Sequence, residues 1–235
     1  MILLALACFG GGKEDSNLAV DTQPDSITYP TQDRILFYDG HGGEPGDSVG
    51  NGGSNIIEAW LNSQGYNAER RDNLGEPEKF RLIMLMDPGV KEPYAFQDAD
   101  VEKLQVAMKT GTRIGIVMSN KNCEGTTINP LLEKLGAEMR LTGENAPTTL
   151  ITNAVGGDQM TEGVSEVYLG TPCTVETNGA EPLLIIDRDT YAARERPGWG
   201  GDIVMVGDFS WMDDTDQLDV GDNRLFMQRM AEVGP

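Results

Sequence analysis

Residues 82–87 read Leu-Ile-Met-Leu-Met-Asp, and this run decides the fold. Its first five residues are all apolar, without the alternation of a strand that has one solvated face. A short apolar run of this kind is typical of a strand buried on both faces of a parallel sheet. Two similar runs, ILFYD at 35–39 and RIGIVMS at 113–119, predict two more strands. The sequence therefore predicts a sheet that is covered on both sides.

Helical patterns separate these strands. Apolar residues recur at helical spacing in residues 54–64 and 99–109, and a short helix is expected after the capping residue Asn129, from Pro130 to Gly136. Further strands are predicted at 66–71, 137–141, 148–152, 166–169, 183–187 and 202–208, and a last helix starts at Asp222 or Asn223. Alternating strands and helices are the pattern of an α/β fold with a mostly parallel sheet.

Composition excludes several classes of function. The chain has 235 residues, 38 Asp plus Glu and 18 Lys plus Arg, which gives a formal net charge of −20. Because a strongly acidic surface repels the phosphate backbone of nucleic acids, we expect no nucleic-acid partner. A single histidine, His41, leaves little scope for histidine-based metal sites and acid–base catalysis.

The N-terminal residues resemble the end of a bacterial secretory signal. Residues 1–8 read MILLALAC, an apolar run too short to span a bilayer, with small residues before Cys8 as in a lipobox. We expect Cys8 to carry fatty acids such as palmitate, residues 9–33 to be a flexible tether, and residues 34–235 to form one domain. This predicts a lipid-anchored protein of the cell envelope. The alternative is a short N-terminal strand or helix that packs on the domain.

A long glycine-rich segment follows the first predicted strand. Residues 39–54 connect a strand to a helix, and this length is far above that of an ordinary connection in an α/β fold. Ligands of open α/β sheets bind at the carboxyl ends of strands, and glycines let backbone NH groups approach them. The predicted ligand-binding residues are Asp39, His41, Gly42, Gly43, Ser48, Asn51 and Ser54. We expect His41 to orient the loop by bonding Asp39 or Asp87. The alternative is a surface loop without a ligand.

An acidic segment precedes the last predicted helix. Calcium takes six to eight oxygen ligands, which spaced aspartates in a loop can supply. The candidate calcium ligands are Asp213, Asp214, Asp216 and Asp219. The alternative is a solvated acidic loop in which Asp222 caps the helix, and in that case we expect no cofactor.

Several segments together resemble the class I glutamine amidotransferase-like superfamily. They are ILFYDGHGG at 35–43, LNSQGYNAE at 61–69, LIMLMDPG at 82–89, NPLLEKLGAE at 129–138, MTEGVSEVYL at 160–169 and the ending that starts with DIVMVGDFSWMDD at 202–214. The branch they are most similar to is the non-enzymatic, ThuA-like one, which includes domains found beside gliding-motility and ABC-transport components. The resemblance implies a flavodoxin-like sheet with helices on both faces.

The resemblance does not extend to the glutaminase triad. Amidotransferases place a nucleophilic cysteine on a sharp turn after a strand, with a histidine and a glutamate downstream. Here Cys123 lies several residues past the strand at 113–119, and His41 is upstream. Two cysteines remain once Cys8 is lipidated, so Cys123 and Cys173 are expected to pair in an oxidising compartment, or else to be two separate thiols.

These observations predict a non-enzymatic envelope lipoprotein. We expect its degenerate amidotransferase-like domain to bind other molecules, as an accessory module of an envelope or transport system, with the membrane as a partner through the lipid. The alternative is a carbohydrate- or peptide-directed hydrolase that uses His41 with Asp39 or with Cys123.

Overall fold

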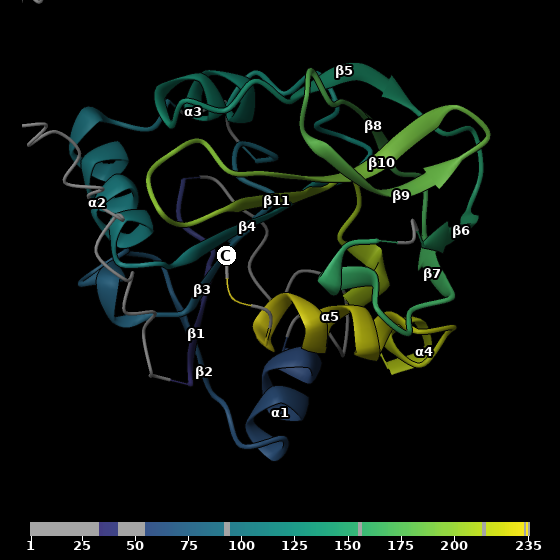
Figure 1. Cartoon of the computed structure of the whole chain (residues 1–235), viewed down its shortest axis with the longest axis horizontal. Helices are drawn as coiled ribbons and strands as arrows, with labels where there is room; N and C mark the ends of the chain where they lie inside the picture. The colour runs from purple at the N-terminus through teal and green to yellow at the C-terminus, as the bar shows by residue number, and fades with distance from the viewer. Residues whose placement is uncertain are drawn as a thin grey trace, which may run out of the picture.

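The computed structural model describes residues 33–41, 55–91, 95–154, 157–212, 215–232 and 234. Within these residues a nine-stranded sheet has the order β2-β1-β3-β4-β11-β10-β9-β6-β7 (Figure 1). The first five strands are parallel: β2 (Asn67–Arg71), β1 (Arg34–Tyr38), β3 (Leu82–Met86), β4 (Arg113–Val117) and β11 (Ile203–Val206). The other four extend the sheet antiparallel: β10 (Asp189–Glu195), β9 (Glu181–Ile186), β6 (Leu150–Ala154) and β7 (Glu166–Leu169).

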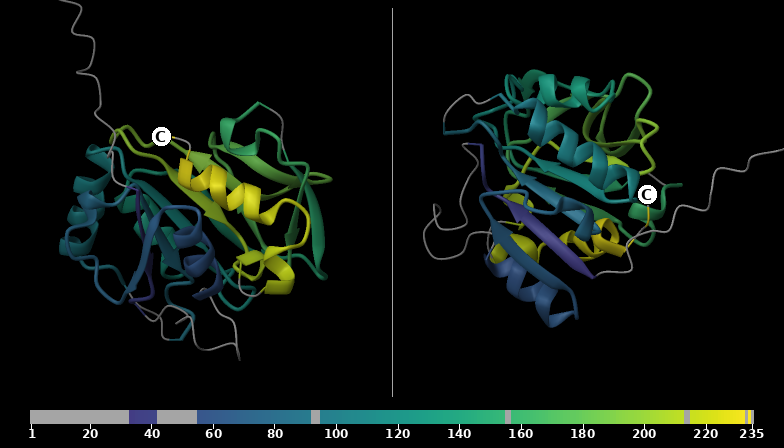
Figure 2. Two further views of the ribbon diagram at one scale, coloured as in Figure 1. Left: turned by 90° about the horizontal axis from the view of Figure 1, so that it is seen from below. Right: turned by 90° about the vertical axis from the view of Figure 1, so that its left-hand side faces the viewer.

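Helices cover both faces of the parallel strands (Figures 1 and 2). One face is covered by α2 (Asp98–Lys109) and α3 (Ile128–Lys134), and the other by α1 (Asn55–Ser63) and α5 (Asn223–Glu232). A single turn, α4 (Thr215–Leu218), precedes α5. Because β3 and β4 face a helix layer on each side, every residue of both strands is buried. The predicted α/β, flavodoxin-like fold is confirmed.

The sequence missed two strands and misplaced a third. β8 (Cys173–Glu176) is only four residues long, and β10 contains Arg194, so neither has a clear apolar pattern. The strand expected at 137–141 is instead β5 (Arg140–Asn145), which pairs with β8 in a separate two-stranded sheet. The sequence therefore did not predict that the second half of the sheet is antiparallel.

Two predicted helix caps have other roles. Asn129 lies inside α3, where its side chain accepts a hydrogen bond from the backbone NH of Leu141 at 2.9 Å and so ties the helix to β5. Asp222 directly precedes α5, but its carboxylate accepts the backbone NH groups of Ser165 and Glu166 at 2.6 and 3.1 Å. Asn129 therefore joins two consecutive elements, whereas Asp222 joins the start of α5 to a segment 56 residues earlier in the chain.

Asparagine side chains bind the backbone of both outer strands of the large sheet. The Asn62 amide pairs with the NH and carbonyl of Ala68 in β2, at 2.8 and 3.1 Å. At the opposite edge, Asn223 accepts the NH of Tyr168 in β7 at 2.9 Å. Unpaired strand edges promote aggregation, so these side chains satisfy part of each edge within the same chain.

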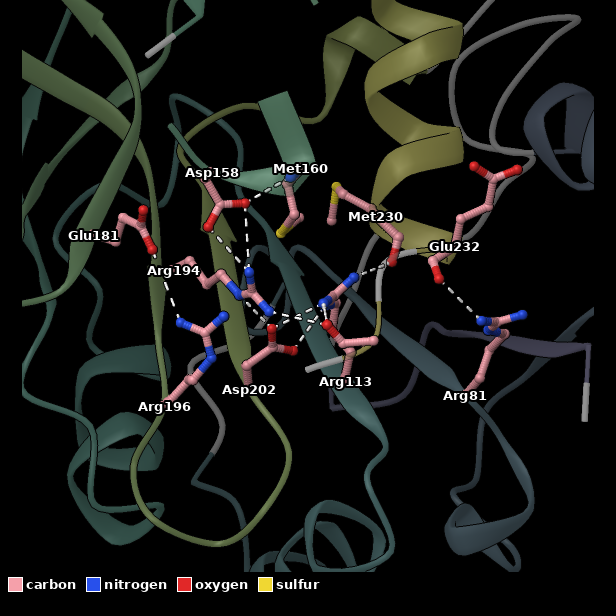
Figure 3. A network of polar contacts seen from close by, with 11 residues as sticks. Arg81, Arg113, Asp158, Met160, Glu181, Arg194, Arg196, Asp202, Met230 and Glu232 are labelled. Atoms are coloured by element: carbon pink, nitrogen blue, oxygen red, sulfur yellow. Dashed lines mark hydrogen bonds and ion pairs between the residues drawn. The ribbon is translucent and has the colours of Figure 1, made fainter. Parts of the chain in front are cut away.

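A network of buried charges joins the parallel and antiparallel halves of the sheet (Figure 3). Asp202, just before β11, accepts two hydrogen bonds from the Arg113 guanidinium of β4, at 2.7 and 2.9 Å. It also accepts one from Arg194 of β10, whose other side contacts Asp158 at 3.0 Å. All four side chains are at most 5% exposed. The strands β4, β10 and β11 and the segment around Asp158 are therefore fixed by one connected set of ion pairs.

The same arginines hold the C-terminal segment. Arg113 donates to the carbonyl of Met230 at the end of α5, and both Arg113 and Arg194 donate to the carbonyl of Gly234, at 3.3 and 3.1 Å. Figure 3 also shows Arg81 donating to the carbonyl of Glu232. The end of α5 is thus anchored to the sheet. Among the described residues, no helix is both long and apolar enough to cross a membrane.

We predict that Asp202→Asn destabilises the protein by about 3–5 kcal/mol, because it leaves two buried guanidinium groups without their shared counter-charge. Urea unfolding followed by circular dichroism measures this. Asp98→Asn is the matched control, because it removes an ion pair with Lys134 that is largely exposed to solvent. A loss for Asp202→Asn no larger than that of the control would contradict the proposed role of the network.

Candidate binding site

The carboxyl ends of the parallel strands surround a cavity of about 220 Å³. Its walls are Asp87 and Val90 after β3, residues 119–121 after β4, residues 170–171 after β7 and residues 208–210 after β11. Connections that follow strands usually hold the ligand in open α/β sheets. This cavity is therefore the candidate site.

Asp87 occupies an unusual backbone conformation at the end of β3. Its φ is +45°, in the left-handed region that residues other than glycine rarely adopt, and its side chain is almost fully buried. The backbone NH donates to the carbonyl of Val117 at 2.8 Å, and Asn122 donates from its amide to the Asp87 carboxylate at 3.3 Å. Such conformations persist where the surroundings hold them, and they cluster at functional sites.

Asp208 lies on the opposite wall, after β11. Its carboxylate accepts hydrogen bonds from the Ser210 hydroxyl, the Ser210 NH at 3.2 Å and the NH of Gly170. Burial raises the pKa of Asp208, because the ionised form loses its hydration. A Cβ atom at Gly170 would lie 2.5 Å from the Ser210 hydroxyl oxygen, so a larger residue here would displace that hydroxyl from Asp208. Asp208 therefore holds two walls of the cavity together.

A disulfide fixes the wall that follows β4. Cys123 and Cys173 are bonded, with their Cα atoms 5.1 Å apart and both side chains buried. Cys173 also donates its NH to the carbonyl of Gly207 at 2.7 Å, which brings β8 against the end of β11. The pairing expected from the cysteine count is thus present. Because Cys123 has no free thiolate in this state, it cannot be the nucleophile of the alternative hydrolase.

His41 lies at the same edge but does not line the cavity. Its ring contacts the Tyr38 hydroxyl through Nδ1 and the Asp100 carboxylate through Nε2 at 3.1 Å, and it stacks on Phe96 with ring centres 4.2 Å apart. The side chain is 7% exposed, and burial lowers its pKa. The expectation that His41 bonds Asp39 or Asp87 is wrong, because the ring reaches α2 instead. Its carbonyl accepts the NH of Gly89 at 2.9 Å, which still ties it to the connection after β3.

Asp39 faces a different partner. Its carboxylate lies 3.7 Å from the Arg70 guanidinium, and burial raises its pKa. With His41 turned to Tyr38 and Asp100, the acid–base pair of the alternative hydrolase is not formed. Gly42, Gly43, Ser48, Asn51 and Ser54 lie outside the described residues, as does Cys8, so their predicted binding and lipidation remain predictions.

The predicted calcium site is only partly within the described structure. Asp213 and Asp214 lie outside it, and of Asp216 only the backbone is described. Asp219 forms an ion pair with Arg224. Across the described ranges, no three His, Cys, Asp or Glu side chains are grouped in a way that could hold a metal ion.

Sequence reasoning missed the two aspartates of the cavity as site residues. Asp87 directly follows the apolar run LIMLM, and Asp208 follows the apolar run IVMV after one glycine. Since the carboxyl ends of parallel strands meet at one edge, this shared position was the available indication. It was obscured because the glycine-rich segment drew the prediction toward β1.

Comparisons with known proteins support the fold. No family model matches the chain, and no curated protein matches it. Among solved structures, the mmIFT52 N-terminal domain is 16% identical with a TM-score of 0.61, and covers 83% of this chain and 94% of its own. Cytoplasmic Protein STM1381 from Salmonella typhimurium LT2 is 11% identical with a TM-score of 0.61, at 84% and 98% coverage. A thua-like protein from Bacteroides uniformis ATCC 8492 is 10% identical with a TM-score of 0.53, at 86% and 90% coverage.

The fold of this chain is similar to that of these solved structures, one of which is described as thua-like. At these identities the likeness concerns the arrangement of strands and helices and leaves the chemistry of the site to its own residues.

We predict that the unfolding free energy of Asp208→Asn increases relative to that of the parent as pH rises. Folding raises the pKa of this carboxyl above 3.8, its value in the unfolded chain. The stability that the group contributes is therefore complete at pH values below 3.8 and is lost as pH rises through the pKa of the folded state. Asparagine cannot ionise, so the variant escapes this loss. The measurement is the difference in unfolding free energy between variant and parent at about pH 4 and about pH 7.

Asp98→Asn serves as the control for this experiment. The hydrogen bond and charge of Lys134 lower the pKa of Asp98. The unfolding free energy of Asp98→Asn therefore decreases relative to that of the parent as pH rises. An Asp208→Asn difference that is constant with pH would show that burial does not disfavour the charged form.

Proposed function

We propose that this protein is a cell-envelope lipoprotein whose catalytically degenerate, amidotransferase-like domain acts by binding, as an accessory module of an envelope or transport system. The observation that carries the proposal is the Cys123–Cys173 disulfide. Cys123 lies several residues past the position of the superfamily's nucleophile, and in the disulfide it also cannot serve as the thiolate of the alternative hydrolase. Disulfides also persist mainly in oxidising compartments outside the cytoplasm, which agrees with export.

The histidine supports a binding role as well. A general base needs access to the proton it removes, but the His41 ring is packed between Phe96 and its partners Tyr38 and Asp100. The cavity is lined by apolar groups such as Val90 and Phe209 together with polar side chains, and its described lining includes neither a histidine nor a free thiol. Such a site recognises a compact molecule by hydrogen bonds and charge rather than by covalent chemistry.

The envelope location is tested by membrane fractionation of cells that express the natural gene. We expect the parent protein to sediment with membranes and Cys8→Ser to become soluble, because the variant lacks the atom that carries the lipid. Ser16→Ala, in the same predicted tether, is the control and should behave as the parent does. If the parent and Cys8→Ser distribute alike, the lipoprotein part of the proposal is wrong.

The non-catalytic assignment is tested with His41→Gln. We expect neither the parent nor this variant to hydrolyse chromogenic glycosides or peptide substrates above the rate without protein. Ligand binding should persist in the variant if its thermal unfolding is preserved. Turnover by the parent that disappears in a folded His41→Gln protein would instead establish the hydrolase.

A further inference from the structure

We infer that the Cys123–Cys173 disulfide is a redox latch for the cavity: in the oxidised protein it holds two cavity walls together, and reduction by a dithiol releases them while the sheet stays folded. The inference rests on the proposed function, since it assigns a form of regulation to the same binding site. It follows from where this bond lies relative to the cavity and to the buried ion network.

The disulfide joins two walls of the cavity. One wall is formed by residues 119–121, which shortly precede Cys123, and another by residues 170–171, which shortly precede Cys173. The two cysteines are 50 residues apart in sequence, so the bond connects segments that the chain itself does not keep together. Because a disulfide limits the separation of its Cα atoms, here 5.1 Å, its rupture removes a direct constraint on the distance between the walls.

A single hydrogen bond joins the same walls in addition to the disulfide, as far as the described residues show. It runs from the Asn120 amide to the Thr171 hydroxyl and is exposed to solvent. An exposed hydrogen bond contributes little to stability, because water replaces either partner when the bond opens. The covalent bond is therefore the main direct link between these two walls.

The two edges of the sheet are held by separate cross-links. At the amino ends, Arg113 at the start of β4 pairs with Asp202 just before β11, and both side chains are buried. At the carboxyl ends of the same strands, Cys123 follows β4, and its partner Cys173 donates its NH to the carbonyl of Gly207 after β11. Reduction therefore releases the edge that carries the cavity and leaves the ion network intact.

The reduction is a thiol–disulfide exchange with a dithiol. Cys123 is 5% exposed and Cys173 is 0% exposed, so the first thiolate of the reductant attacks the sulfur of Cys123, and Cys173 leaves as a thiolate that takes up a proton. The second thiol of the reductant loses its proton and displaces Cys123, which is protonated in turn, and the reductant becomes a disulfide. The protein gains two electrons and two protons in this exchange.

The reduced state has an acceptor for its new thiol protons. The carbonyl oxygen of Ser119 lies 3.9 Å from the sulfur of Cys123 and 3.2 Å from that of Cys173. Each thiol is a weak donor, so neither is left without a polar neighbour once the bond is broken. Both oxidation states are therefore compatible with a folded domain.

Hydrogen exchange of individual backbone amides in the full chain tests the inference. Serine replaces Cys8 throughout, so that Cys123 and Cys173 are the only cysteines present. The reductant is dithiothreitol, and alkylation followed by mass spectrometry counts the free thiols. Circular dichroism measures whether the sheet and helices persist after reduction.

Two amides report on the walls. Gly143 donates its NH to the carbonyl of Cys123 at 3.1 Å, and Cys173 donates its NH to the carbonyl of Gly207 at 2.7 Å. We expect reduction to raise the exchange rates of both amides at least about tenfold, because the walls then open locally without global unfolding.

An amide at the ion network is the internal control. The NH of Ile114 donates to the carbonyl of Asp202 at 2.9 Å, at the opposite edge of the sheet. Its exchange rate should change less than about twofold on reduction, because this edge keeps its own cross-link. The comparison separates a local latch from a general loss of stability.

Variants show that the reductant acts through this bond. The double variant Cys123→Ser and Cys173→Ser should exchange rapidly at Gly143 with or without dithiothreitol. Asn120→Ala is the matched control, because it removes only the exposed hydrogen bond between the walls, and its oxidised form should exchange within about threefold of the parent. Reduction of the parent tests the inference even if the double variant does not fold.

The outcomes separate the latch from the proposed function. Unchanged exchange at the walls of the reduced protein, an equal increase at Ile114, or a bond that dithiothreitol does not reduce in the folded protein would each overturn the latch. None of these results alters the fractionation or turnover experiments, which decide between an envelope binding module and a hydrolase. Conversely, a protein that fractionates as soluble but whose walls open on reduction would reject the lipoprotein and retain the latch.

Discussion

The buried ion network around Asp202 is the constraint on which the rest of the structure depends. Asp202 is fully buried between Arg113 of β4 and Arg194 of β10, and these two arginines also bind the C-terminal backbone at Gly234. Charges so deep are tolerated only when they are paired and hydrogen-bonded. The pairing fixes where the parallel sheet ends and where its antiparallel extension begins. It also fixes α5 against the sheet.

The position of β11 set by this network determines the candidate site. Asp208 follows β11 and accepts hydrogen bonds from Gly170, which follows β7 in the antiparallel extension. The wall after β4 is held by the bond between Cys123 and Cys173. Each wall of the cavity therefore comes from a different part of the chain, and the hydrogen bonds of Asp208 and the disulfide hold these walls at defined positions. Such preorganisation is what a binding site needs to recognise a compact ligand.

The candidate site could be predicted only in part. Sequence reasoning placed the site at the carboxyl ends of strands and identified the cysteines that pair, because both inferences rest on strand order and residue counts. It assigned the ligand to residues 39–54 after β1, most of which lie outside the described residues, so that assignment remains a prediction; it did not identify the cavity after β3, β4, β7 and β11. The partner of His41 was also missed, because Asp100 is 59 residues away and lies on a helix whose rotation against the sheet is decided by packing.

The sequence by itself determined the parallel half of the fold. Runs such as 82–86 contain only apolar residues, and a short strand that is apolar on both faces is stable only at the centre of a covered sheet. Only the tertiary structure decided the antiparallel extension and the site. β10 contains a buried arginine that reads as a surface residue until Asp202 and Asp158 are placed beside it. The physical reason is that apolar burial follows from the residue alone, whereas a buried charge depends on partners that are distant in sequence.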